Sequence, residues 1–348
     1  MENHGIGFIQ DIGDSMKILV TGGLGFIGSN FIRYMLSKHE NINIINIDKM
    51  SYGSNPENLK DFEKDQRYSF IKGDIADYSL IEKAVRNVDA IVNFAAETHV
   101  DRSISDPNPF LQSNLIGVFT ILEAIRKENR NAKFIQISTD EVYGSILDES
   151  FKEDDPLTPS NPYSASKAAA DIFCLAYNKT YGLDIRITRC TNNFGPYQFP
   201  EKLIPKTIIR ASLNLKIPVY GTGKNIRDWI YVTDHCEAIE KVITDGEAGE
   251  IYNISAGNEY ENIEVVKEIL KIMGKSEDLI EFVEDRPGHD LRYSLDSSKI
   301  RKLGWKPRHS FEDALRKTVK WYLENGWWWR PLATDKILHP TPWKLEWI

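Results

Sequence analysis

The chain has 348 residues, of which 41% are hydrophobic and 27% charged, a composition typical of a globular protein with one or two domains. Its formal net charge of −8 argues against general affinity for nucleic acid, so any anionic ligand must meet a local positive site. No apolar stretch reaches the ~18–20 residues of a membrane span, and three cysteines without a disulfide or CxxC pattern favour a cytoplasmic protein.

The first predicted strand, residues 17–21, leads directly into a turn with Gly22, Gly25 and Gly28, and helical spacing of apolar residues follows. Glycines at these positions allow a tight turn, close approach of the backbone to a pyrophosphate, and close packing of the helix. A glycine motif alone is weak evidence, because a purely structural turn would use it as well. Its strand–turn–helix setting near the start of the chain favours dinucleotide binding.

An acidic residue stands where such a motif needs one. Asp48 lies twenty positions after Gly28, at the end of the predicted strand 42–47. A carboxylate at this point accepts hydrogen bonds from the ribose hydroxyls of NAD and repels the additional phosphate of NADP. The alternative is an ordinary surface aspartate, and Lys49 beside it weakens the discrimination. We therefore expect NAD as the preferred cofactor.

Two further strand ends follow. Residues 70–71 lead to Asp74, a candidate acceptor for the adenine amino group, and residues 90–94 lead to Ala95 and Ala96, whose small side chains allow close passage along a cofactor. We interpret His99, in the same loop, as a structural hydrogen-bonding residue. Strand and helix patterns keep alternating up to residue 138, so the first half is predicted to be a doubly wound parallel sheet.

The chemistry-bearing residues follow the predicted strand 133–137. Thr139 comes directly after it, and Tyr163 and Lys167 lie four residues apart, on one face of a predicted helix. A tyrosine, with an ordinary pKa of about 10, becomes a useful base when a lysine and a positive nicotinamide ring favour phenolate. Tyr163 would then remove a hydroxyl proton while hydride leaves for NAD, with Thr139 aligning the hydroxyl.

The order of three motifs, at residues 21–28, 138–144 and 163–167, resembles the extended short-chain dehydrogenases that act on nucleotide sugars. Over residues 16 to about 329 the chain is most similar to the dTDP-glucose 4,6-dehydratase family. The resemblance implies a Rossmann-type sheet with a smaller mixed α/β substrate-binding domain. It also implies a hydro-lyase that oxidises C4 with NAD, eliminates water across C5–C6 and returns the hydride to C6.

Two adjacent acids distinguish this chain within that superfamily, whose epimerases typically carry small residues there. By resemblance Glu141 is the general base for the C5 proton, and Asp140, held protonated, is the general acid for the C6 hydroxyl. Each acid could keep its neighbour protonated by repulsion between like charges. Adjacency alone does not assign the two roles. The predicted catalytic residues are Thr139, Asp140, Glu141, Tyr163 and Lys167.

The second half supplies polar residues suited to a nucleotide sugar. Asparagine both donates and accepts hydrogen bonds, and by resemblance Asn192 faces the substrate and Asn193 the cofactor. Lys202, at the amino end of a predicted helix, suits a diphosphate, as does Arg227 by resemblance. We interpret Cys190 as a packing residue.

The complete set of contacts expected from these patterns and the resemblance involves no metal. The expected cofactor residues are Gly22, Gly25, Phe26, Ile27, Gly28, Asp48, Lys49, Ser51, Asp74, Ile75, Phe94, Ala95, Ala96, Thr98, Ser113, Tyr163, Lys167 and Asn193. The expected substrate residues are Thr98, Thr139, Asn192, Lys202, Leu203, Pro218, Tyr220, Arg227, Asn262, His289 and Tyr293.

The expected domains are a cofactor domain (16–190, with a segment near 228–255 returning to it) and a substrate domain (mainly 191–330). Residues 1–15 are expected to form a loosely ordered extension. In the tail, 331–348, we expect the tryptophans to cover an apolar surface or a subunit contact. The family's paired helices imply a homodimer, with dTDP-glucose as substrate and no nucleic-acid or membrane partner.

Three alternatives stay open. A nucleotide-sugar epimerase or decarboxylase would share the fold, NAD and the Tyr163–Lys167 pair, but the two acids disfavour an epimerase. A dehydratase for a UDP- or GDP-sugar would share even the acids. A non-catalytic NAD-binding module would keep the glycines but would have no use for Thr139 together with Tyr163 and Lys167.

Overall fold

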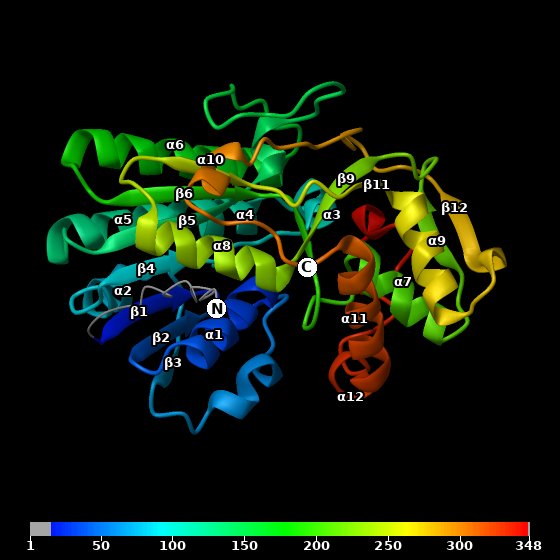
Figure 1. Ribbon diagram of the computed structural model, residues 1–348, viewed down its shortest axis with the longest axis horizontal. Coiled ribbons are helices and arrows are strands. Elements are labelled where there is room, and N and C mark those ends of the chain that lie inside the picture. Colours follow the sequence, from blue (N-terminus) through cyan, green and yellow to red (C-terminus); the bar gives the residue numbers. More distant parts are fainter. Residues whose placement is uncertain (1–14, 347–348) are drawn as a thin grey trace, which may run out of the picture.

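The computed structural model describes residues 15–346. Seven strands form one parallel sheet in the order β10-β6-β5-β4-β1-β2-β3 (Figure 1). The chain winds outward from β1 in one direction through β2 and β3, and in the other through β4, so the prediction of a doubly wound sheet is confirmed. The strands are β1 (Met16–Thr21), β2 (Ile42–Asp48), β3 (Tyr68–Lys72), β4 (Ala90–Asn93), β5 (Lys133–Thr139), β6 (Ile185–Cys190) and β10 (Ile251–Ile254).

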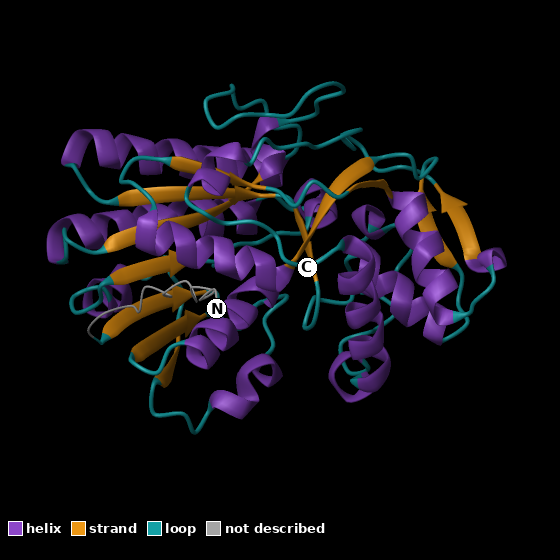
Figure 2. Cartoon of the chain, viewed as in Figure 1, coloured by secondary structure: helices purple, strands orange, loops and turns teal. Residues whose placement is uncertain are grey.

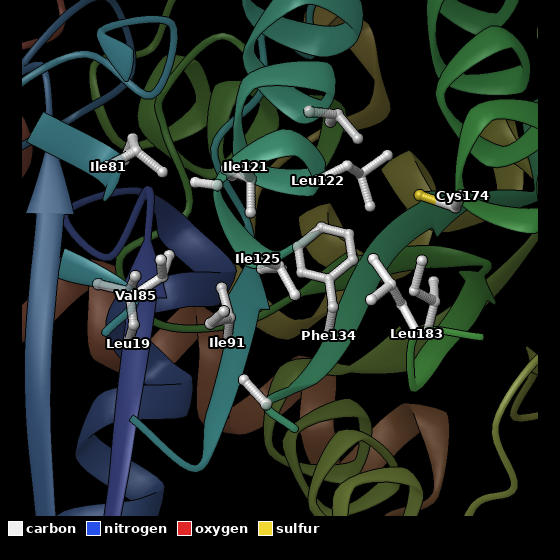
Figure 3. Packing of buried hydrophobic residues seen from close by; sticks show 14 of the residues in the cluster. Leu19, Ile81, Val85, Ile91, Ile121, Leu122, Ile125, Phe134, Cys174 and Leu183 are labelled. Atoms are coloured by element: carbon white, nitrogen blue, oxygen red, sulfur yellow. The ribbon is translucent and has the colours of Figure 1, made fainter. Parts of the chain in front are cut away.

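Helices cover both faces of this sheet because its central strands are apolar on both sides. Leu19 packs with Ile121 and Leu122 on one face (Figure 3), whereas its neighbours Ile18 and Val20 pack on the other. The first face is covered by α2 (Tyr78–Ala84), α5 (Gly117–Glu128) and α6 (Pro162–Tyr181), and the second by α1 (Phe26–Lys38) and α8 (Val232–Asp245). Shorter helical segments are η1 (Pro56–Phe62), α3 (Val100–Ser105), α4 (Asn108–Leu111), η2 (Gln112–Ile116) and η3 (Asp140–Tyr143).

A smaller part lies beside the carboxyl edge of the large sheet (Figure 2). It holds a three-stranded sheet, β11-β9-β7, and a two-stranded sheet, β12-β8. Its core brings together Ile208, Trp229, Ile269 and Leu315. The strands are β7 (Asn192–Phe194), β8 (Ile217–Tyr220), β9 (Ile226–Tyr231), β11 (Glu259–Glu261) and β12 (Ile280–Val283). Its helical segments are α7 (Leu203–Ser212), α9 (Asn262–Met273), η4 (Glu277–Leu279), α11 (Phe311–Glu324) and α12 (Gly326–Trp329), and α10 (Ser298–Lys302) links β12 to α11.

The two parts exchange chain segments. Within residues 228–255, α8 covers the large sheet and β10 extends it, whereas β9 belongs to the three-stranded sheet. The link α10 then lies against β10, because Ile300 shares an apolar cluster with Tyr252 and Ile254.

The described part of the tail packs on the smaller part. Leu338 joins its core, and its carbonyl oxygen accepts a hydrogen bond from Arg210 at 2.7 Å. Trp343, in η5 (Pro342–Lys344), is 8% exposed and lies edge-on to Tyr220, with 4.7 Å between ring centroids. Residues 1–14 and Trp347 lie outside the described residues. Between residues 15 and 346, no helix is long and apolar enough to cross a membrane.

Candidate active site

One cavity of about 270 Å³ is lined by residues that follow β1 to β6, at the carboxyl edge of the large sheet. Every residue expected to contact the cofactor lies in its lining, and so do the five expected catalytic residues. Of the expected substrate residues, four line it: Thr98, Thr139, Asn192 and Lys202.

The glycine-rich turn forms one wall of the cavity. Gly22 has a φ of +72°, and a Cβ there would lie 2.5 Å from the backbone nitrogen of Ala95. A Cβ on Gly28 would lie 2.5 Å from the carbonyl oxygen of Gly22. The N-cap of α1 is Gly25, which offers no side chain to the first amide groups of the helix. The backbone amide groups at the start of α1 and the helix dipole are thus available to a pyrophosphate. The glycine turn, which we call the pyrophosphate cradle, therefore fits a dinucleotide.

Asp48 holds the adjoining loop in place. One carboxylate oxygen accepts from the amide of Leu24 at 3.0 Å, and the other from the amide of Met50 at 2.7 Å and the hydroxyl of Ser54 at 2.8 Å. The carboxylate is 4% exposed yet contributes to the cavity wall. Asp74 lines the same side, with one oxygen accepting from the amide of Ala76 at 2.9 Å.

Tyr163 and Lys167 begin α6, which Asn161 caps by accepting from the amide of Ser164 at 2.9 Å. The ammonium group of Lys167 donates to the carbonyl oxygen of Ile137 at 2.6 Å. Burial, followed by the charge of Glu141, raises the pKa of Tyr163 well above its ordinary value. Burial also lowers the pKa of Lys167.

From the sequence we expect Lys167 together with a bound nicotinamide ring to lower the pKa of Tyr163, and this stays a prediction. In the protein alone, burial and Glu141 dominate and the phenol stays protonated. Formation of phenolate therefore depends on positive charge brought by a bound ligand.

The two acids occupy η3, directly after β5. The hydroxyl of Thr139 donates to Asp140 at 3.1 Å and accepts from the amide of Glu141 at 3.3 Å. One carboxyl oxygen of each acid, Oδ2 of Asp140 and Oε2 of Glu141, is buried without a hydrogen-bond partner among the described residues. Since buried polar atoms are normally paired, these two oxygens mark a place for substrate groups.

The surroundings of the two acids differ. Burial and the neighbouring charge of Glu141 raise the pKa of Asp140 well above the usual carboxyl range. Burial also raises the pKa of Glu141, but Arg286, Arg227 and Lys202 act in the opposite direction. Of the two acids, Asp140 is therefore the one held more strongly in its protonated form, and Glu141 the one that ionises more readily.

Asn193 differs from the simple expectation of a side chain turned to the cofactor. Its amide nitrogen donates to the carbonyl oxygen of Thr191 at 3.0 Å, and its amide oxygen lies 2.9 Å from Nδ1 of His235. His235 is buried, which lowers its pKa to about 3 and keeps the ring neutral. Asn193 lines the cavity, but both ends of its carboxamide already have hydrogen-bond partners within the protein.

The other expected substrate residues do not line this cavity. Several gather beside it on β8, β9 and the loop after β12. The guanidinium carbon of Arg227 lies 4.2 Å from the ring centroid of Tyr293, whose hydroxyl donates to Asp290 at 2.6 Å. His289 lies 2.6 Å from Asp285, and Oδ1 of Asn262, at the start of α9, is buried without a partner in the described structure.

Leu203 and Pro218 are placed differently from the rest. The side chain of Leu203 packs against two apolar clusters of the smaller part, and Pro218 is buried in β8. Their side chains are therefore used in the core, and contacts to a ligand would have to come from the backbone.

Several further polar residues of the lining escaped the sequence analysis, namely Tyr52, Glu97, Arg102, Gln198 and Glu201. They come from loops and from the short helix α3, far apart in the chain, and no local spacing distinguishes them. His99 lies 3.2 Å from Glu201 and 3.8 Å from Asp101, and burial lowers its pKa to about 4, in keeping with its structural interpretation. Between residues 15 and 346, no cluster of His, Cys, Asp and Glu side chains could hold a metal ion.

A parallel sheet with a dinucleotide cradle on one side of a cavity and a tyrosine–lysine pair on the other is the architecture of the extended short-chain dehydrogenases. Comparison with known proteins agrees. The family model described as GDP-mannose 4,6 dehydratase matches residues 19–318. The chain therefore belongs to the nucleotide-sugar 4,6-dehydratase family of this class.

Individual relatives point to the same family. The dTDP-glucose 4,6-dehydratase of Streptomyces niveus is 48% identical over 324 residues, which cover 92% of this chain and 96% of that protein. The crystal structure of dTDP-glucose 4,6-dehydratase from Bacillus anthracis in complex with NAD has a TM-score of 0.86 and 48% identity, covering 91% of this chain and 99% of that one. UDP-glucose 4-epimerase of Thermus thermophilus, in complex with NAD, has a TM-score of 0.82 but only 29% identity, over 89% of this chain and 100% of that one.

Proposed function

We propose that this chain is a dTDP-glucose 4,6-dehydratase that uses NAD and forms dTDP-4-keto-6-deoxy-glucose. The observation that carries the proposal is the adjacency of Asp140 and Glu141, each with an unpaired buried oxygen, to Thr139 and the Tyr163–Lys167 pair in one cavity. Thr139, Tyr163 and Lys167 suit oxidation of an alcohol. Asp140 and Glu141 add the general acid and the general base that elimination of water requires. The names of the relatives support dTDP-glucose as the substrate.

Bound NAD would accept a hydride from C4 of the glucose and later return it to C6. The glycine turn and the uncapped start of α1 would hold its pyrophosphate, and Asp48 its ribose. Tyr163, lowered in pKa by the positive ring, would take the proton of the C4 hydroxyl. Thr139 would hydrogen-bond the same hydroxyl and align it.

The C4 ketone acidifies the proton on C5, and Glu141 would remove it. Asp140 would give its proton to the C6 hydroxyl, which leaves as water. After hydride returns to C6, Glu141 would give a proton, exchanged with solvent, back to C5. Asp140 is then left without its proton and Tyr163 still holds the proton of the C4 hydroxyl, so transfer of one proton from Tyr163 to Asp140 by way of solvent would restore the starting state. Each acid or base contributes roughly 10²–10⁴ to the rate.

The nucleotide end of the substrate would lie toward the smaller part. Lys202 lines the cavity and caps α7, and Arg227 is buried beside Tyr293. Two cations at this place suit a diphosphate in a protein with a net charge of −8. A UDP- or GDP-sugar would use the same cations, so the base is the part of the substrate to be tested.

Pure protein is incubated in heavy water with dTDP-glucose, UDP-glucose or GDP-mannose, without added NAD. A 4-keto-6-deoxy product with deuterium at C5, formed fastest from dTDP-glucose, is the expected result. A C4 epimer as the main product would contradict the proposal. Glu141→Gln should oxidise C4 and then stop, so that reduced cofactor accumulates on the protein, whereas Glu247→Gln, at an exposed position, should behave like the wild type.

A homodimer is part of the proposal, with α5 and α6 as the contact. Ile116, Phe119, Ile172 and Phe173 are 40%, 39%, 57% and 40% exposed on these helices and on η2, which precedes α5. The rings of Phe119 and Phe173 lie 6.3 Å apart, so the apolar residues form one continuous face, which a second copy would bury. Light scattering should give twice the chain mass, and Ile172→Glu should give a monomer.

The expected location in the cytoplasm remains a proposal. Cys174, Cys190 and Cys236 are all buried and free of disulfide bonds, as suits a reducing compartment. Fractionation of cells that express the full chain would test it.

A further inference from the structure

A set of polar side chains crosses the cavity between the two parts of the fold. Tyr52 comes from the loop after β2 and Arg102 from α3, both on the large sheet, whereas Glu201 stands just before α7 in the smaller part. All three line the cavity. We call Tyr52, Arg102 and Glu201 the Tyr52 bridge.

Tyr52 makes the contacts that join the two sides. Its hydroxyl donates to a carboxylate oxygen of Glu201, 149 residues further along the chain. Its ring lies 5.1 Å from the ring of Phe199, measured between centroids. The guanidinium carbon of Arg102 lies 3.7 Å from the centroid of the same ring, a close cation–π contact. The tyrosine is thus held on three sides.

The large sheet supplies a rigid base for the bridge. Arg102 is paired with Glu97 at 3.2 Å, and Glu97 also lies 3.6 Å from the ammonium group of Lys49. The backbone of Glu97 is fixed by Asn114, which accepts from its amide at 2.8 Å and donates to its carbonyl oxygen at 3.0 Å. Arg102 therefore has little freedom to follow a ligand that leaves.

The loop that carries Tyr52 has a different character. Met50 and Gly53, on either side of it, have positive φ angles of +57° and +86°. Such angles are unfavourable for methionine, so the loop keeps this shape only through its contacts. The hydrogen bond to Glu201 and the ring contact with Phe199 join this loop to the segment that leads into α7.

We propose that the Tyr52 bridge retains the dinucleotide in the cavity throughout a catalytic cycle. The inference rests on the proposed function, in which hydride taken from C4 returns to C6 of the same molecule. If the reduced cofactor were released between these steps, no hydride would be available for C6 and the oxidised sugar could not be converted to product. The bridge lies beside the wall formed by Asp48 and Ser51, and opening it breaks a hydrogen bond to a charged group. Tyr52 is in this sense a positioning residue.

The test measures retention of the cofactor directly. Wild type and Tyr52→Phe are loaded with NADH, and the dissociation rate is followed by the loss of its bound fluorescence in the presence of excess NAD. Loss of a hydrogen bond to a charged group predicts a rate about tenfold or more higher for Tyr52→Phe. Tyr52→Phe should also release free NADH into solution during turnover of dTDP-glucose, which the wild type should not do.

Tyr34→Phe is the matched control, because the hydroxyl of Tyr34 also donates to a glutamate, Glu240, but on the outer side of the fold between α1 and α8. Its dissociation rate should equal that of the wild type. Glu201→Gln removes the charge from the same pair and should speed release as well. Thermal unfolding without ligand shows whether a variant is folded, and whichever of the two bridge variants is folded decides the outcome.

A dissociation rate within twofold of the wild type, in a folded bridge variant, would overturn the inference while leaving the proposed function intact. A wild-type protein that binds no NADH, or that binds it but does not dehydrate dTDP-glucose, would instead overturn the proposed function. The two failures are therefore distinguishable.

Discussion

Lys167 donates a hydrogen bond to the carbonyl oxygen of Ile137 at 2.6 Å. This bond connects the first turn of α6 to the carboxyl end of β5, the strand that ends at Thr139. Lys167 is 3% exposed, so its charge is little screened by water. Its position is set by the backbone of β5 and not by Tyr163. The lysine thus supplies a fixed positive charge within the cavity wall, next to the place where the phenolate must form.

Replacement of Lys167 by methionine tests this role. Burial and Glu141 already raise the pKa of Tyr163, so loss of the lysine should make phenolate still less accessible and slow C4 oxidation by roughly 10²–10⁴. The appearance of bound reduced cofactor after rapid mixing with dTDP-glucose measures this step. Lys179→Met, at an exposed position of the same helix, should react like the wild type. Oxidation by Lys167→Met at the wild-type rate would rule out the role.

The two acids predict a bell-shaped dependence of elimination on pH. Glu141 acts ionised, so activity is lost as pH falls through its raised pKa. Asp140 acts protonated, so activity is lost as pH rises through its own raised pKa. Arg286 is the foremost influence that lowers the pKa of Glu141. In Arg286→Gln the acid limb should therefore move to higher pH.

The measurement is the single-turnover rate of water elimination from pH 5 to 9. Arg292→Gln is the control, because Arg292 lies on the same loop but pairs with Glu259 at 2.7 Å. An acid limb of Arg286→Gln that stays in place, or moves to lower pH, would show that Glu141 is not the base that this limb reports.

Much of the fold was predictable because it depends on patterns formed by residues close together in the sequence. Short apolar runs bounded by turn residues marked the first five strands of the large sheet, β1 to β5, and glycine spacing marked the first turn. The edge at which Asp48, Thr139 and Tyr163 meet then followed from the rule that parallel strands end together. These residues do line one cavity.

Features that depend on three-dimensional surroundings were not predictable in this way. The pKa of Tyr163 is decided by burial and by Glu141, neither of which the spacing to Lys167 reveals. The carboxamide oxygen of Asn193 is hydrogen-bonded to His235, 42 residues away in the sequence. The contact of Tyr52 with Glu201 joins two loops with no recurring pattern. Such long-range pairs have no signal in a single sequence.

Gly22→Ala should abolish dinucleotide binding. The added Cβ would lie 2.5 Å from backbone of Ala95, and φ at +72° is unfavourable for alanine. The clash involves backbone on both sides, so the turn must open, at a cost of roughly 1–3 kcal/mol in the free energy of unfolding. Calorimetric titration with NAD and unfolding in urea measure the two effects.

Gly182→Ala is the matched control, because Gly182 also has a positive φ of +68°, but no atom lies within 4 Å of an added Cβ. It should lower stability by roughly 1–2 kcal/mol, because alanine is strained in the left-handed region, and leave NAD affinity unchanged. If Gly22→Ala bound NAD as tightly as Gly182→Ala, the glycine turn would not be the pyrophosphate cradle.

A buried ion pair behind the catalytic strand end gives the last prediction. Asp171 of α6 is 0% exposed and accepts from Nε of Arg189 at 2.9 Å and from the hydroxyl of Ser138 at 3.0 Å. Arg189 also donates to the hydroxyl of Tyr143 at 2.7 Å, at the end of η3. The pair thus joins α6, β5, β6 and the turn that carries the two acids.

Asp171→Asn keeps the shape of the side chain but leaves the guanidinium of Arg189 buried without its counter-charge. The expected loss is about 3–5 kcal/mol in the free energy of unfolding, because an uncompensated buried charge is strongly unfavourable. Glu268→Gln breaks the exposed pair with Lys271 and should change stability by less than about 1 kcal/mol. Urea unfolding of both variants measures the difference. Equal stabilities would mean that Arg189 finds water or another acceptor, and the catalytic turn would then owe its position to the packing of β5 alone.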